Sequence, residues 1–205
     1  MARHQREAAP RVDDLTAKAR IRNAALELFA TQGVAATSLR AVATAGGVAV
    51  GLIVHHYGTK DALRESVELA IVERFAESII SVPLDAAPAE QITEMRDHAV
   101  AAMLSDSPAI VDYLRRALLD GGAQRGDLVS RLSQLAVQQV HDLRAAGVFS
   151  TKNSVSEQVV TIMVRQLGRL FLQPLVDRIA EEFATDSDTV RKPRLIVDVS
   201  HIDQV

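Results

Sequence analysis

Cysteine and tryptophan are absent from this chain of 205 residues, and aromatic residues make up only 3% of it. Without cysteine the chain forms no disulfide, binds no metal through thiolates and offers no thiol nucleophile. Glycine and proline are also few, with 10 and 6 residues. This scarcity of helix breakers, together with the abundance of Ala, Leu and Val, favours an all-α fold.

A long uncharged apolar run is also missing. No segment approaches the roughly 18 residues of a membrane span, and the first residues, MARHQREAAPRVDD, are polar rather than signal-like. We therefore expect a cytoplasmic protein with no membrane partner. Hydrophobic residues still make up 48% of the chain, which is ample for a buried core.

Positive charge is concentrated at the start of the chain. Residues 1–64 contain nine Lys or Arg against five Asp or Glu, whereas residues 65–205 contain 14 against 21. A basic first part suits a phosphate-binding surface, and an acidic remainder would be repelled by a polyanion. The alternative interpretation is a chance segregation of charges on a solvated surface.

Two short apolar segments flank the pair Gly46-Gly47. The first begins at Thr37-Ser38, where a hydroxyl suits an N-cap, and its apolar residues follow helical spacing. The second runs from about Val48 to His56. Two glycines allow a sharp reversal between the segments. This outline predicts a helix-turn-helix, whose second helix can enter a major groove.

Apolar periodicity predicts helices along the rest of the chain as well. A helix over residues 15–31 precedes the pair, and a long helix over residues 60–81 follows it and ends before Pro83. The long helix carries apolar residues spaced by four, namely Leu63, Val67, Ile71, Phe75 and Ile79. Further helices are expected over residues 89–104, 108–119, 127–146, 156–172 and from Pro174 to about 185.

The last two of these helices, over about residues 156–184, are unusually apolar. A helix that is apolar nearly all round must be buried nearly all round. We therefore expect a homodimer through these helices, because two-fold dimers are the commonest oligomers. The alternative is that both helices only fill the core.

These segments predict about nine helices in four regions. Residues 1–14 are expected to form a flexible basic arm, and residues 15–64 a three-helix head with the helix-turn-helix. Residues 65–188 form a larger helical domain. Residues 189–205 form a tail that is either a short extended segment or disordered.

The head resembles the tetracycline-repressor (TetR) family of bacterial transcription regulators. The resemblance covers about a fifth of the chain and rests on Ala24, Ala25, Leu28, Phe29, Gly33, Thr37, Ser38, Arg40, Val42, Ala43, Gly47, Val48, Gly51, His56, Tyr57, Lys60 and Leu63. It implies a homodimer that binds a near-palindromic DNA operator through its heads. It also implies that the larger domain binds a small molecule that releases the DNA, so that the protein represses a neighbouring efflux or metabolic gene.

The predicted DNA-binding residues lie in and beside the helix-turn-helix. They are Thr37, Ser38, Arg40, Ala49, Val50, Gly51, Leu52, Val54, His55, His56 and Lys60. Lys60 and Arg40 are expected to hold phosphates, while Val50, Gly51 and Leu52 approach the bases. Two positions depart from the family: Ala49 replaces a capping serine and Val54 replaces a phosphate-binding tyrosine. These departures predict fewer polar contacts with DNA than is usual.

Side chains that can line a cavity in the larger domain predict the small-molecule site. They are Phe75, Met95, His98, Met103, Tyr113, Gln139, Met163, Gln166 and Phe171. Methionine and aliphatic side chains favour a bulky apolar effector, although the same residues can fill an ordinary core. We expect no metal and no cofactor.

Two other functions compete with the regulator. A ligand-binding or scaffold protein that keeps the head without specific DNA binding is motivated by Ala49 and Val54. An enzyme is not expected, because the sequence has no Gly-x-Ser-x-Gly, no His-Glu-x-x-His and no dinucleotide fingerprint.

Overall fold

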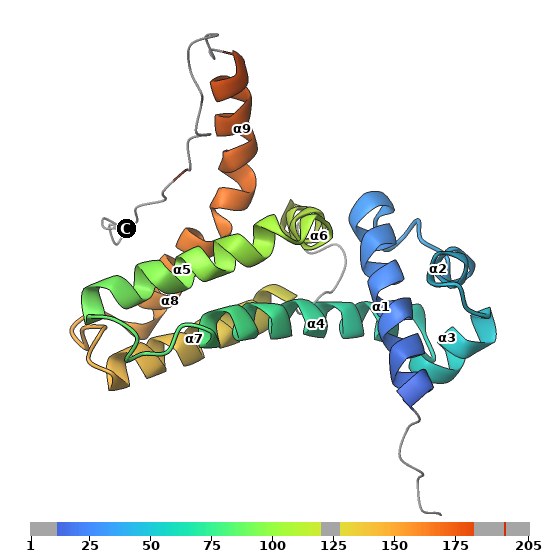
Figure 1. Ribbon diagram of the computed structural model, residues 1–205, viewed down its shortest axis with the longest axis horizontal. Coiled ribbons are helices and arrows are strands. Elements are labelled where there is room, and N and C mark those ends of the chain that lie inside the picture. Colours follow the sequence, from blue (N-terminus) through green and yellow to red (C-terminus); the bar gives the residue numbers. More distant parts are fainter. Residues whose placement is uncertain (1–11, 120–127, 183–194, 196–205) are drawn as a thin grey trace, which may run out of the picture. The chain divides into compact units, whose positions relative to one another are not determined.

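The structure is a computed structural model, and it describes residues 12–119, 128–182 and 195. Within these residues it contains nine helices and no strand, so the predicted all-α class is confirmed (Figure 1). The chain divides into two compact units, residues 1–68 and 69–205. The predicted arm lies almost wholly outside the described residues, as do the loop at 121–127 and nearly all of the tail.

The first unit is built on three helices and the start of a fourth. These are α1 (Val12–Gln32), α2 (Leu39–Gly46), α3 (Val50–Tyr57) and α4 (Lys60–Ile80). Its core consists of fully buried apolar side chains, among them Ile21, Phe29, Val42, Ile53 and Leu63. The helix α4 runs on into the second unit, and its predicted apolar row is buried throughout.

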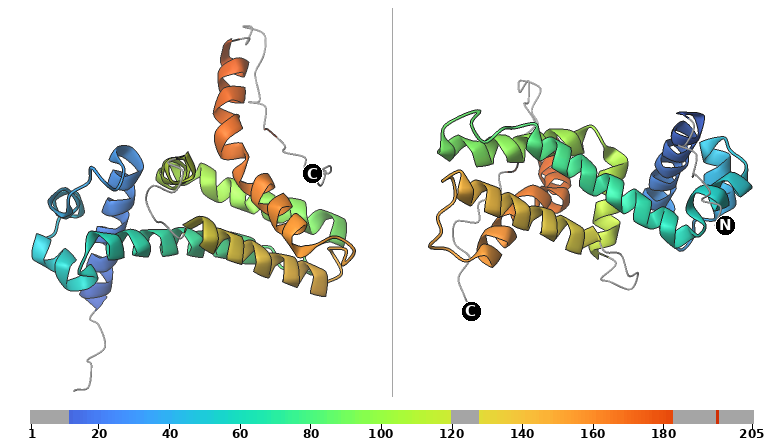
Figure 2. Two further views of the ribbon diagram at one scale, coloured as in Figure 1. Left: turned by 180° about the vertical axis from the view of Figure 1, so that it is seen from behind. Right: turned by 90° about the horizontal axis from the view of Figure 1, so that it is seen from below.

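The second unit continues with five helices. These are α5 (Ala89–Ser105), α6 (Pro108–Leu119), α7 (Leu128–Ala145), α8 (Val155–Leu167) and α9 (Arg169–Glu182). α7 and α8 pack together as a helical hairpin (Figure 2). Part of the core joins α5, α7 and α8 through Ile92, Ala136, Val140, Leu143 and Ile162. The helix α8 starts at a complete capping box formed by Ser154 and Glu157.

The predicted start of the last helix at Pro174 is wrong. α9 begins at Arg169, directly after Gly168, and Pro174 lies inside it. Proline removes one helical hydrogen bond, which here would have joined residue 174 to the carbonyl of Leu170. The Nε atom of Arg115 donates to that carbonyl at 2.7 Å. The helix therefore tolerates Pro174 because a side chain from α6 satisfies the freed acceptor.

The helices α8 and α9 present many apolar side chains to solvent in the single chain. Val160, Leu172, Leu175 and Ile179 are all exposed, with Leu175 at 55%. The prediction that these helices are buried nearly all round therefore does not hold within one chain. By length and composition alone, Val155–Glu182 is apolar enough to cross a membrane, although it contains Arg165 and Arg169.

Candidate functional site

The helix that leads into the turn, α2, is capped at both of its ends. Ser38 caps the start of α2, where its Oγ accepts from the amide of Ala41 at 3.1 Å. Gly47 ends α2 in the left-handed region with φ of 63°, a conformation that suits glycine. The chain direction changes by 107° between α2 and α3. This crossing lies within the range of DNA-binding helix-turn-helix pairs.

Two contacts hold α3 against α1. Ile53 is fully buried in the core, and the hydroxyl of Tyr57 donates to the carbonyl of Lys18 at 2.8 Å. The ammonium of Lys18 lies 5.7 Å from the centre of the Tyr57 ring, within cation–π range. Burial raises the pKa of Tyr57, against smaller opposing effects of Ser66 and Arg22. Tyr57 is half-buried and therefore positions α3 through these two contacts with Lys18.

Thr37 and Lys60 are occupied within the domain. Thr37 is only 1% exposed, and its hydroxyl donates to the carbonyl of Gly33 at 2.8 Å. The Nζ of Lys60 lies 2.9, 3.3 and 3.1 Å from the carbonyl oxygens of Val34, Ala35 and Thr37. These bonds use all three donors of an ammonium group. In this geometry Lys60 clamps the loop between α1 and α2 instead of presenting free donors to a phosphate, contrary to the sequence prediction.

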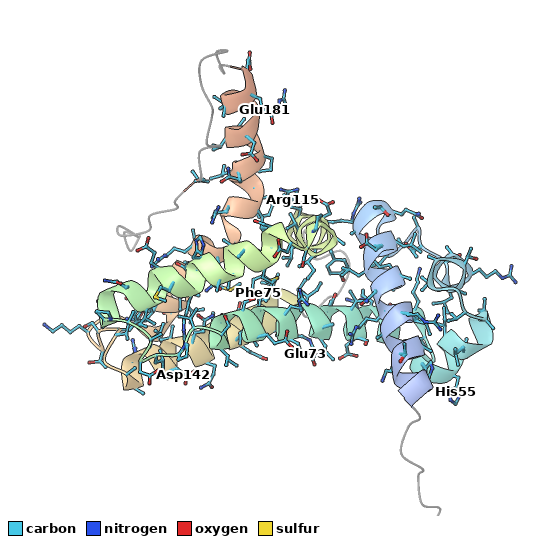
Figure 3. The ribbon with its side chains drawn as sticks, viewed as in Figure 1. His55, Glu73, Phe75, Arg115, Asp142 and Glu181 are labelled. Carbon is cyan, nitrogen blue, oxygen red and sulfur yellow. The ribbon has the colours of Figure 1, made fainter. Side chains whose placement is uncertain are left out.

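The outward face of α3 opposes the buried Ile53. Four of the predicted residues are exposed there, namely Val50, Gly51, Val54 and His55, and Figure 3 labels His55 at the surface of α3. A Cβ atom added at Gly51 would meet no atom within 4 Å, so this face is open. Leu52 and His56 are half-buried beside it. The face therefore offers apolar contacts and one imidazole to a ligand.

The start of α2 adds polar groups, whereas the start of α3 does not. Ser38 and Arg40 are both exposed. At the start of α3, Ala49 makes no side-chain cap bond. The amide of Leu52 bonds to the carbonyl of Ala49 at 3.0 Å, and the amides of Val50 and Gly51 are left to water or to another ligand. A helix N-terminus with free amides attracts anions.

The second unit holds a cavity of about 160 Å³ between α5, α6, α8 and α9. Its lining consists of Ala101, Leu104, Ser105, Val111, Arg115, Gln166, Arg169, Leu170 and Gln173. Of the residues predicted for the small-molecule site, Gln166 lies in this lining. Phe75, Met103, Tyr113 and Gln139 are buried elsewhere in the unit, Met163 packs against the core, and Met95, His98 and Phe171 are exposed.

Two polar residues of this cavity, Arg115 and Arg169, were not predicted from the sequence. Arg115 and Arg169 lie 54 positions apart and belong to different helices. Next to the cavity, Asp97 forms an ion pair with Arg165 at 2.6 Å and accepts from Gln166 at 3.3 Å. Burial raises the pKa of Asp97, although Arg165 and Gln166 oppose the rise. The sequence held one indication of these polar residues, because Arg165 and Arg169 are charged residues within an otherwise apolar segment.

The first unit has the geometry that defines the helix-turn-helix class of DNA-binding domains. Residues 21–67 match the model of the bacterial regulatory proteins of the tetR family. Residues 21–67 therefore form a DNA-binding domain of the TetR type, as the resemblance predicted. Nothing in this match implies an enzyme. In the described part of the chain, no group of three His, Asp or Glu side chains could hold a metal ion.

Several proteins of known description are similar to this chain. The HTH-type transcriptional regulatory protein RaaS of Mycobacterium tuberculosis is 31% identical over 135 residues, which span 66% of this chain and 58% of RaaS. A tetR family transcription regulator from Shewanella sp. PV-4 shares the fold, with a TM-score of 0.65 and 19% identity over 81% of this chain and 90% of that one. The multidrug binding protein EbrR, solved with imidazole, has a TM-score of 0.55 and 22% identity over 82% and 87% of the two chains.

Proposed function

We propose that this protein is a cytoplasmic transcription regulator that binds a near-palindromic DNA operator as a homodimer. The observation that carries the proposal is the open face of α3, held at 107° to α2 by a buried Ile53 and a capped turn. A second helix presented in this way fits the major groove. The description of RaaS as a regulatory protein supports the same function.

The DNA contacts divide into two kinds. The exposed Ser38 and Arg40 at the start of α2, with the uncapped amides at the start of α3, hold phosphates. Val50, Gly51, Val54 and His55 face the bases, where valine methyls suit the thymine methyl group and the imidazole can hydrogen-bond. Lys60 contributes by fixing the loop that carries Thr37 and Ser38. Recognition thus depends on apolar contact and DNA shape more than on polar base contacts.

The homodimer is supported by the exposed apolar side chains of α8 and α9. Val160, Leu172, Leu175 and Ile179 would leave a large apolar surface in water. A two-fold interface lets each copy cover this surface of the other. The dimer also gives the two heads the symmetry that a palindromic operator requires.

The cavity of the second unit supports control by a small molecule. We propose that a compound bound there weakens DNA binding, so that the protein acts as a repressor of a nearby efflux or metabolic gene. EbrR is described as a multidrug binding protein, which agrees with such a ligand-binding role in a protein of this fold.

A matched pair of variants tests the DNA-binding surface. Val54→Glu places a carboxylate in the centre of the open α3 face, and Val129→Glu makes the same change at an exposed valine of α7. Fluorescence anisotropy with a duplex enriched from a random pool should show binding lost for Val54→Glu and kept for Val129→Glu. Equal binding by the two variants would contradict the proposed α3 surface. Failure to enrich any duplex from the random pool would favour a scaffold protein whose head does not bind DNA specifically.

A second matched pair tests the dimer. Leu172 on α9 and Leu119 on α6 are both exposed leucines, at 48% and 72%. Analytical ultracentrifugation should find a dimer for the wild-type protein and for Leu119→Asp, but a monomer for Leu172→Asp. A wild-type monomer, or a dimer that survives Leu172→Asp, would contradict the proposed interface.

A further inference from the structure

The cavity between α5, α6, α8 and α9 is lined by two guanidinium groups and by apolar side chains. Arg115 comes from α6 and Arg169 from the first turn of α9, and both line the cavity with Gln166. Leu104, Val111 and Leu170 provide apolar walls. No carboxylate is part of this lining. A site with a few convergent polar groups over apolar walls is typical of small-molecule binding.

Arg115 is held in place before any ligand arrives. Its Nε donates to the carbonyl of Leu170 at 2.7 Å, and its Nη1 lies 3.2 Å from Oδ1 of Asp112. A guanidinium group has five N–H donors, so these two bonds leave three for another acceptor. Because the side chain is already ordered, a ligand does not have to immobilise it.

The charges around the cavity leave a positive excess. Arg165 neutralises Asp97 through the 2.6 Å ion pair, and Asp112 is bonded to Arg115. Arg169 interacts with Asp97 only by a weaker Coulombic attraction. The positive charges of Arg115, Arg165 and Arg169 are therefore balanced by only two carboxylates, those of Asp97 and Asp112. An anion between Arg115 and Arg169 would balance the remaining charge, and a carboxylate matches the paired N–H groups of arginine.

The size of the cavity suits a small ligand. Its volume is about 160 Å³, and an engineered protein cavity of about 150 Å³ accommodates benzene. One ring or a short branched chain therefore fits beside Leu104 and Val111.

The cavity and the proposed dimer surface use neighbouring sides of α9. Leu172, Leu175 and Ile179 form one exposed stripe, at i, i+3 and i+7. Arg169 and Gln173, which line the cavity, lie roughly a quarter of a turn away from this stripe. The cavity lining and the dimer surface are therefore adjacent on this helix.

We propose that this cavity binds a small monocarboxylate, whose carboxylate lies between Arg115 and Arg169 and whose apolar part contacts Leu104, Val111 and Leu170. This replaces the bulky apolar effector expected from the sequence. The inference deepens the proposed function, since its role in gene control depends on that function. A bound ligand would tie α6 to the first turn of α9 and so act on the helix that carries the dimer surface.

Benzoate and its uncharged analogue benzamide test the site in the absence of DNA. Isothermal titration calorimetry on the full-length protein should detect benzoate at millimolar concentration and much weaker binding of benzamide. Arg169→Gln should weaken benzoate binding roughly tenfold or more, because it removes a charged hydrogen-bond donor. Arg178→Gln, at an exposed arginine of the same helix, is the control and should bind benzoate like the wild-type protein.

Three results would overturn the proposal: no binding of benzoate, equal binding of benzoate and benzamide, or equal affinities of the Arg169→Gln and Arg178→Gln variants. Circular dichroism of each variant shows whether it is folded, and a folded Arg169→Gln protein makes the comparison valid. DNA binding is measured separately with the ligand absent. A protein that binds DNA but not benzoate contradicts this inference alone, and one that binds benzoate but not DNA contradicts the proposed function alone.

Discussion

The side chain of Arg115 on α6 supplies the hydrogen bond that Pro174 removes from α9. Its Nε donates at 2.7 Å to the carbonyl of Leu170, which lies four residues before the proline. A helix interior is normally closed to proline, at a cost of about 3 kcal/mol. The α9 helix therefore tolerates Pro174 because Arg115 bonds to the freed carbonyl. The same arginine lines the cavity of the second unit.

This dependence predicts a coupling between Arg115 and Pro174. Arg115→Met leaves the Leu170 carbonyl without its donor and should lower the free energy of unfolding by about 1–3 kcal/mol. In a Pro174→Ala background the amide of residue 174 can take over this acceptor, so the same change should cost less. Urea unfolding of the four proteins measures the coupling as a double-mutant cycle. Additive effects would contradict the shared acceptor.

Lys60 and Arg40 should differ in what they stabilise. Lys60→Met removes three bonds to the loop before α2 and should lower the free energy of unfolding by about 1–3 kcal/mol. Arg40→Ala should leave stability within about 0.5 kcal/mol, because the side chain is exposed, yet weaken DNA binding. Thermal unfolding and anisotropy on the same samples separate the two effects. If Lys60→Met is as stable as the wild-type protein, the clamp on the loop is contradicted and Lys60 is instead expected to bind a phosphate.

Adjacent glycines provide a matched test of the turn. Gly47 has φ of 63°, so Gly47→Ala should destabilise the protein by about 1–2 kcal/mol. A Cβ at Gly46 would lie 3.7 Å from the Cβ of Ala24, an ordinary contact, so Gly46→Ala should be neutral or slightly stabilising. Chemical denaturation of the two variants checks this order. The reverse order would show that the turn does not have this geometry.

Asp97 predicts a dependence of stability on pH. Burial raises the pKa of Asp97, so the folded protein holds this proton at a pH where the unfolded chain has lost it. A raised pKa stabilises the folded state at low pH, and this contribution is lost as pH rises from the unfolded value through the folded one. The stability of the wild-type protein relative to Asp97→Asn should therefore increase as pH falls from 7 toward about 4. Urea unfolding at several pH values measures the difference, and a difference that decreases would contradict the direction of the shift.

The sequence predicted well those features that depend on local spacing. The apolar row of α4, the Ser38 cap and the reversal at Gly47 follow from residues within one or two turns of each other. The sequence-based predictions were wrong where the role of a residue depends on a partner far away in the chain. Lys60 meets carbonyl oxygens more than 20 residues away, and Pro174 is tolerated only because of Arg115. The cavity combines residues of four helices, so no single segment marks it.

Selection of DNA from a random duplex pool is the most direct test of the central claim. Full-length protein should enrich a sequence with two symmetric half-sites about one helical turn apart, about 10 base pairs between centres or a multiple of this. Its affinity should fall steeply as salt concentration rises, because phosphate contacts release counterions. Failure of the folded wild-type protein to enrich any sequence, or enrichment of a single half-site without symmetry, would contradict a dimeric regulator that reads DNA through α3.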